Sequence, residues 1–151
     1  MHRLGPKIVA LGSTFVLVAA LALSPWAAET AEAHVSAKWQ RKAAQVAYRY
    51  WKKQRPKRAI CHPAQVKIKQ TQGKPNGHWA FAPLDVCAKS DRKPWIKVWH
   101  KAGKYGWTTY CSLIVHEWGH LIGLKHSKKK TDVMHPVVGP KNFVKLCGRA
   151  P

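Results

Sequence analysis

Five residues at fixed spacing between positions 116 and 126 constrain this chain more than any other feature of its sequence. They are His116, Glu117, His120, Gly123 and His126, in the pattern His-Glu-x-x-His-x-x-Gly-x-x-His. On a helix, His116 and His120 lie one turn apart on the same side, where both imidazoles can bind one metal ion. A glycine with positive φ can end the helix and turn the chain, which would bring His126 back to that ion. Three neutral imidazoles and an open fourth position are the ligands of a catalytic zinc site.

Glu117 is expected to lie beside the zinc ion rather than on it, where a carboxylate can take a proton from a zinc-bound water. It is the only glutamate after residue 33, and the other acids there are Asp85, Asp91 and Asp132. So few scattered carboxylates argue against a calcium site, which usually needs several. We interpret four histidines outside the pattern as ordinary polar residues: His34, His62, His78 and His100.

The first 33 residues have the layout of a secretory signal peptide. Arg3 and Lys7 precede an apolar run over residues 8–23, and Ala31 and Ala33 supply the small residues of a cleavage site. The run is short for a membrane span of about 20 residues, so a cleaved signal is favoured over an uncleaved anchor. The sequence therefore predicts a signal peptide at residues 1–33 and one secreted domain at residues 34–151.

The net charge of +21 is the second unusual feature, and removal of residues 1–33 leaves it unchanged. Such a field would attract anionic partners, among them acidic proteins, wall polymers, lipid head groups and nucleic acid. No nucleic-acid motif is present, and we expect a monomer. Lys128, Lys129 and Lys130 follow the third histidine, which makes acidic substrate segments an alternative to a simple solvated loop.

The chain contains four cysteines, all of them after residue 33: Cys61, Cys87, Cys111 and Cys147. An even number in a small exported domain predicts two disulfides. The sequence itself does not choose among the three possible pairings; we favour Cys61–Cys87 with Cys111–Cys147. A four-cysteine zinc site is the alternative, although no Cys-x-x-Cys spacing supports it.

Residue periodicity predicts an α+β domain. A helix over residues 37–54, capped by Ser36, has one apolar stripe and several basic faces, and is expected to pack on a sheet. Residues 65–70, 78–82 and 95–99 are typical of short strands. A second helix would begin at Thr108 or Thr109 and carry the histidine pattern to Gly123, and a last short helix is expected around residues 141–147.

The pattern over residues 116–126 resembles the extended zinc motif of the metzincin metalloproteases. Metzincins also have a methionine in a tight turn beneath the metal, and the sequence Asp-Val-Met-His-Pro at residues 132–136 supplies Met134. Met134 lies eight residues after His126, Ser127 directly follows the third histidine, and Pro136 follows the turn methionine by two places. This spacing most resembles the matrixin branch.

The resemblance implies a small metzincin-like fold, with a twisted, mainly parallel sheet above the zinc helix. One edge strand, from residues 81–87 or 95–99, would pair antiparallel with bound substrate. The segment after Met134 would form one wall of a substrate pocket. His135 stands where matrixins often have tyrosine, and Pro136 stands where astacin-like proteases place a tyrosine ligand, so no tyrosine ligand is expected.

The same resemblance implies the function of a secreted zinc endopeptidase. In it, Glu117 would be the catalytic base, Met134 a structural residue, and the zinc ligands would be His116, His120 and His126. The substrate would be a protein or peptide, and one zinc ion the only cofactor. The alternative interpretation is a highly basic secreted binding protein for an anionic polymer, cell surface or nucleic acid, whose zinc site is structural or inactive.

Overall fold

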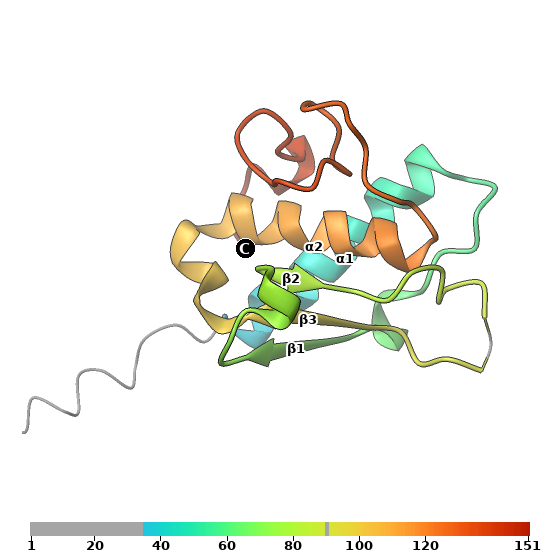
Figure 1. Cartoon of the computed structure of the whole chain (residues 1–151), viewed down its shortest axis with the longest axis horizontal. Helices are drawn as coiled ribbons and strands as arrows, with labels where there is room; N and C mark the ends of the chain where they lie inside the picture. The colour runs from blue at the N-terminus through green and yellow to red at the C-terminus, as the bar shows by residue number, and fades with distance from the viewer. Residues whose placement is uncertain (1–34, 90) are drawn as a thin grey trace, which may run out of the picture. The chain divides into compact units, whose positions relative to one another are not determined.

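The computed structural model describes residues 35–89 and 91–151 (Figure 1). The predicted signal peptide, residues 1–33, and His34 lie outside the described residues. Within them, the chain forms two α-helices, three strands and four short 3-10 helices. None of the helices in these ranges has both the length and the apolar character that a membrane crossing requires.

The three strands form one mixed sheet, which confirms the predicted α+β class. β1 (Lys67–Thr71) pairs in parallel with β3 (Trp95–Trp99) over five residue pairs, and β2 (Ala80–Phe81) pairs antiparallel with β3 over two. The strand order is β1-β3-β2, so β2 is an antiparallel edge strand on a mainly parallel sheet, as the resemblance implied.

Two details of the predicted edge are wrong. Trp95–Trp99 is the central strand, paired on both sides, and cannot offer an edge to a substrate. Of residues 81–87, only Phe81 belongs to a strand. The chain after Phe81 leaves the sheet because the backbone amides of Asp85 and Cys87 donate to carbonyls at the end of the second α-helix instead.

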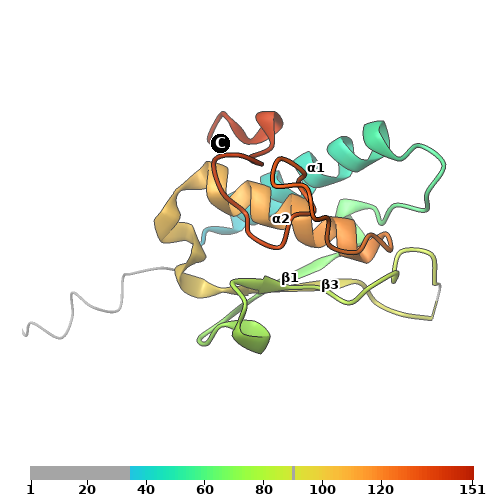
Figure 2. The same cartoon turned by 45° about the horizontal axis from the view of Figure 1, so that its top comes forward.

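Both α-helices lie on the same face of the sheet (Figure 2). α1 (Ala37–Gln54) matches its prediction: the Ser36 hydroxyl accepts a hydrogen bond from the Trp39 amide at 3.2 Å. α2 (Trp107–Leu121) is buried along 12 of its 15 residues, because α1, the sheet and the C-terminal segment all pack against it. The indole Nε1 of Trp51 in α1 donates to the carbonyl of Val115 in α2 at 2.8 Å.

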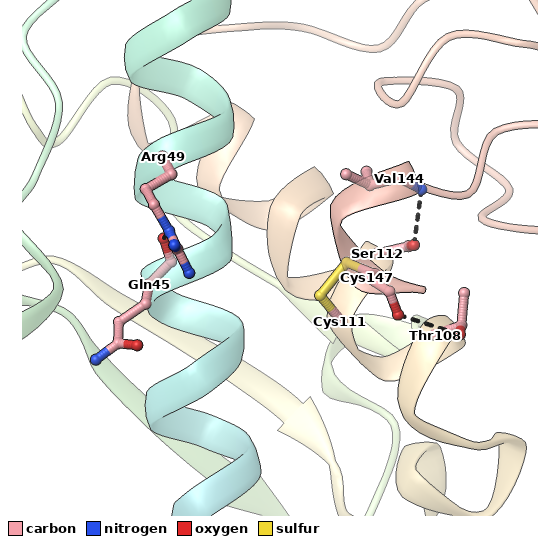
Figure 3. Close-up of a disulfide and its surroundings, with 7 residues drawn as sticks. All are labelled: Gln45, Arg49, Thr108, Cys111, Ser112, Val144 and Cys147. Atoms are coloured by element: carbon pink, nitrogen blue, oxygen red, sulfur yellow. Dashed lines mark hydrogen bonds between the residues drawn. A yellow bond between two sulfur atoms is a disulfide. The ribbon is translucent and has the colours of Figure 1, made fainter. Parts of the chain in front are cut away.

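α2 begins at Trp107, earlier than the predicted start at Thr108 or Thr109. Its N-cap is Gly106, whose φ of 84° closes the 3-10 helix η4 (His100–Tyr105) and whose carbonyl accepts from the Tyr110 amide. Thr108 does not cap the helix because its hydroxyl donates to the carbonyl of Cys147 at 3.2 Å (Figure 3).

The predicted C-terminal helix is reduced to one 3-10 turn, η5 (Lys145–Cys147). Asn142 explains the difference, because its side chain accepts from the Gly139 amide at 2.7 Å and donates to the Val137 carbonyl at 2.9 Å. These bonds satisfy the Gly139 amide and the Val137 carbonyl in a loop conformation, and therefore favour the loop over a helix.

Two disulfides fix the connections to α2. Cys61 bonds to Cys87, and Cys111 in α2 bonds to Cys147 in η5, which is the pairing favoured from the sequence. The second disulfide is supported by the amide of Val144, which donates to the buried hydroxyl of Ser112 at 3.0 Å (Figure 3). The C-terminal segment is thereby held against the outer side of α2.

Gly119 allows the closest approach within the core. A Cβ atom at this position would lie 2.9 Å from Cε of Met134 and 2.9 Å from Cζ2 of Trp51. Real side chains do not tolerate such distances, so the absence of a side chain lets both residues pack directly on the α2 backbone.

Gly119→Ala should therefore destabilise the protein by about 1–3 kcal/mol through overpacking. Replacement of glycine by alanine in a helix interior usually stabilises a protein, by ~1 kcal/mol, so the expected change in unfolding free energy is opposite to the usual one. Urea denaturation of both variants would measure the effect, with Gly73→Ala as the control because nothing lies within 4 Å of its Cβ position. A more stable Gly119→Ala protein would contradict the packing described here.

Candidate metal centre

The structure brings the three predicted ligand histidines together. The Nε2 atoms of His116 and His120 are 3.2 Å apart, those of His116 and His126 are 3.3 Å apart, and those of His120 and His126 are 3.1 Å apart. Among the described residues, this is the one group of three or more His, Cys, Asp or Glu side chains placed to hold a metal ion.

A turn centred on Gly123 brings His126 back to the helix. Gly123 has a φ of 86°; its amide donates to the carbonyl of His120, and the Leu124 amide donates to that of Gly119, each at 2.9 Å. These two bonds are the Schellman motif, which requires a left-handed residue just after the helix. The predicted role of Gly123 thus follows from backbone hydrogen bonding.

Residues distant in the sequence complete this helix end, and no local pattern pointed to them. The Asp85 amide donates to the carbonyl of His120 at 2.8 Å, and the Cys87 amide donates to that of Leu121 at 2.9 Å. The Arg58 guanidinium donates to the carbonyl of Ile122 at 2.8 Å. The carbonyls at the end of α2 are therefore paired, which fixes the helix end beside the metal centre.

Hydrogen bonds at the far ring nitrogens determine which atoms face the centre. Nδ1 of His116 lies 2.7 Å from the carbonyl of Val133, and Nδ1 of His120 lies 2.7 Å from the carbonyl of Leu124. A carbonyl oxygen can only accept, so each Nδ1 carries the proton. In the neutral imidazole, Nε2 then has a free lone pair directed at its neighbours.

Zinc fits this arrangement. The Nε2 lone pairs of His116 and His120, 3.2 Å apart, cannot satisfy one another, because neither of these neutral rings has a proton to donate there. A cation between them resolves the conflict. A tetrahedral zinc ion with bonds of about 2.0–2.1 Å separates its ligands by roughly 3.3–3.4 Å, close to the 3.1–3.3 Å between the three Nε2 atoms.

The surroundings keep these imidazoles neutral. Burial lowers the pKa of His116 to about 4, and the adjacent His120 and His126 also lower it. Burial likewise lowers the pKa of His120 and of His126. His78 and His135 contribute to the lowered pKa of His126, so two histidines outside the ligand set lie near the centre.

Glu117 lies in the same cavity as the three histidines and is only 4% exposed. Burial raises the pKa of its carboxyl group to about 8, although the backbone amide of Ala82, just after β2, donates to it and acts in the opposite direction. A metal cation bound nearby would lower this pKa and favour the carboxylate.

Met134 lies in the predicted turn, beneath α2. The Asp132 carboxylate accepts from the Met134 amide at 2.9 Å, the Ser127 amide donates to the Met134 carbonyl at 2.9 Å, and the side chain packs at Gly119. The Val133 carbonyl in the same turn orients His116. The turn therefore acts on the metal centre through backbone contacts and packing.

The metal centre opens into a cleft of 610 Å³ between β2 and the segment after the methionine turn. Its walls are mainly apolar, and include Leu84, Leu113, Val137 and Val138. His78, interpreted from the sequence as an ordinary polar residue, lines the same cleft. Its proximity depends on the antiparallel return of β2, which local spacing does not reveal.

Together, the mixed sheet and the three-histidine site with its adjacent glutamate are those of a metzincin-type zinc metallopeptidase. The sequence model of the family described as Matrixin matches residues 23–147. The chain therefore belongs to the matrixin family. Comparison with curated proteins and with solved structures gave no match.

The lowered pKa values predict how zinc affinity depends on pH. Protons compete with zinc for imidazole, so ligands with an ordinary pKa near 6.5 would lose affinity as soon as the pH fell below about 6.5. Here the decline should begin at lower pH, because burial keeps His116 neutral down to about pH 4 and lowers the pKa of His120 and His126 as well.

Competition with a chromophoric chelator, measured at intervals between about pH 7 and pH 5, would test this prediction. His62→Gln is a suitable control because His62 is exposed and lies outside the ligand set. A loss of affinity that begins at the pKa of free histidine would contradict it.

Proposed function

We propose that this protein is a secreted zinc-dependent endopeptidase. One observation carries the proposal: three histidine Nε2 atoms converge beside the buried Glu117 at the floor of an apolar cleft whose wall is an edge strand. This arrangement combines metal ligands, a proton acceptor and a surface for an extended peptide. The two disulfides are compatible with an oxidising extracellular compartment.

Glu117 is proposed to transfer the protons of the reaction. When bound, zinc supplies Lewis acidity, which polarises a peptide carbonyl and acidifies water. The Glu117 carboxylate accepts a proton from the water that attacks the carbonyl carbon, and then donates it to the leaving amine as the peptide bond breaks. The Ala82 amide, which donates to the carboxylate, would hold it in place for both transfers.

The substrate would bind along β2. One edge of Ala80–Phe81 pairs with β3, and the residues of this strand also line the cleft. An extended peptide could therefore add to the sheet as a further strand, with alternate side chains directed into the cleft. The apolar walls favour an apolar substrate side chain next to the scissile bond.

We propose that the basic surface attracts acidic substrates without selecting the side chain that enters the cleft. Lys128, Lys129 and Lys130 are exposed, but none of them lines the cleft. Lys129 lines a separate, polar cavity of 400 Å³ on the other side of His126. Long-range attraction of this kind would raise the association rate and weaken at high salt.

Glu117→Gln should abolish most peptide hydrolysis, because the amide cannot accept the proton from water. General-base catalysis contributes roughly 10²–10⁴-fold, so kcat should fall by at least about 100-fold while the variant still binds zinc. The assay would use the zinc-loaded protein, casein and a mixed peptide library. Asp91→Asn is the matched control, since it removes the same charge from an exposed carboxylate outside the cleft.

Two results would count against the proposal. Full activity in Glu117→Gln would exclude the assigned proton acceptor. Absence of cleavage by the wild-type protein, with one zinc ion bound per chain, would favour the alternative of a basic binding protein whose metal site is not catalytic.

A further inference from the structure

Neither α-helix covers the outer face of the sheet, because both lie on its inner side; a short 3-10 turn in the β1–β2 connection, η3 (Pro75–Gly77), lies on the outer side (Figure 2). Ile96 and Val98 of β3 point inward and are fully buried. Strand alternation therefore directs Trp95, Lys97 and Trp99 outward. The register places further outward residues beside them, and we define the outer face by the whole set: Lys67, Lys69, Thr71, Phe81, Trp95, Lys97 and Trp99.

Aromatic rings on this face hold lysine ammonium groups in place. Nζ of Lys97 lies 5.1 Å from the ring centroid of Trp95, and Nζ of Lys74, in the β1–β2 connection, lies 5.2 Å from that of Trp99. Cation–π attraction of this kind fixes side chains that would otherwise be mobile. The rings thus provide a platform for positive charge.

Neighbouring rings extend the platform along the sheet. The centroids of Phe81 and Trp95 are 5.9 Å apart, and those of Trp79 and Trp99 are 6.1 Å apart. Trp79 is in turn stacked on Tyr105 at 4.2 Å. Trp95 and Trp99 therefore each carry a lysine on the ring, and Trp79 and Tyr105 cover one face of each other.

The positive charge on the outer face has no internal counter-charge. Lys69 and Lys97 are direct cross-strand partners, on strands that lie about 4.7–4.9 Å apart, and like charges in this position are unfavourable. The sequence has no Asp or Glu between residues 33 and 84 or between residues 92 and 116. Within the described ranges, no carboxylate forms a salt bridge with Lys67, Lys69, Lys74 or Lys97.

We propose that this outer face binds an acidic polysaccharide. Carboxylate groups repeated along such a polymer would pair with Lys67, Lys69 and Lys97 and relieve the repulsion between the last two. Binding would hold the protein on an anionic extracellular matrix, whatever the activity of the metal centre.

The details of the surface favour a polysaccharide over two other polyanions. Single-stranded nucleic acid binds to such surfaces by stacking bases on free aromatic rings, but here Trp95 and Trp99 already carry lysines and Trp79 is stacked on Tyr105. Peripheral membrane binding uses apolar side chains that project into the bilayer. Of the aromatic residues described, only Tyr105 is largely exposed, at 53%.

The test compares the binding of the full disulfide-bonded chain to polygalacturonate and to dextran by isothermal titration calorimetry. Polygalacturonate should bind and the neutral dextran should not. Lys69→Gln/Lys97→Gln should weaken binding by about tenfold, as expected for the loss of two exposed charge pairs. Addition of a zinc chelator should not change the affinity, because the outer face contains none of the metal ligands.

The matched control is Lys128→Gln/Lys130→Gln, which removes the same charge from exposed positions away from the sheet. An equal loss of affinity in both double variants would show that net charge alone drives binding and would overturn the proposal. So would tighter binding of poly(dT), or of phosphatidylglycerol vesicles, than of polygalacturonate at equal charge concentration.

A stability measurement on the single variant Lys69→Gln tests the repulsion without removing Lys97 from the Trp95 ring. Removal of the cross-strand repulsion should leave the Tm of Lys69→Gln unchanged or raised in the absence of polymer. A clearly lower Tm would contradict the unbalanced repulsion on which the inference rests.

Discussion

The metal centre depends on one backbone feature, the left-handed turn at Gly123. It ends α2 after Leu121 and directs the chain back so that His126 reaches the two helical histidines. A helix end in the protein interior is unstable unless its carbonyls are paired. Here the amides of Asp85 and Cys87 and the guanidinium of Arg58 supply the partners. The Cys61–Cys87 disulfide fixes the loop that supplies two of them, so fold and site share one set of contacts.

The parts of the structure that could be predicted from sequence are those set by local spacing. The four-residue separation of His116 and His120 required a helix, and Gly123 required a turn, because both rules concern neighbours along the chain. The bounds of α1 were predicted correctly for the same reason, because the Ser36 cap and the apolar stripe are both features of a single helix. The family resemblance added the mixed sheet, with a topology that spacing alone does not determine.

The remaining features depend on where distant segments meet. The composition of Trp95–Trp99 does not distinguish an edge strand from a central one. Its pairing on both sides shows that it is central and cannot be the edge to which a substrate adds. His78 lines the cleft because β2 returns antiparallel along β3, and Asn142 prevents a C-terminal helix through side-chain bonds that reach back to Val137 and Asp132. The unpaired lysines of the outer face, too, were visible from the sequence only as a high net charge.

The central claim is that three neutral histidines hold one zinc ion at this site, with Met134 excluded from the ligand set. X-ray absorption spectroscopy at the zinc edge tests it most directly, using protein loaded with one equivalent of zinc. The account predicts three imidazole nitrogens and one oxygen at about 2.0–2.1 Å. The imidazole signal should weaken in His126→Ala, with no sulfur contribution in either protein. A zinc–sulfur distance of about 2.3 Å, or an unchanged spectrum in His126→Ala, would contradict it.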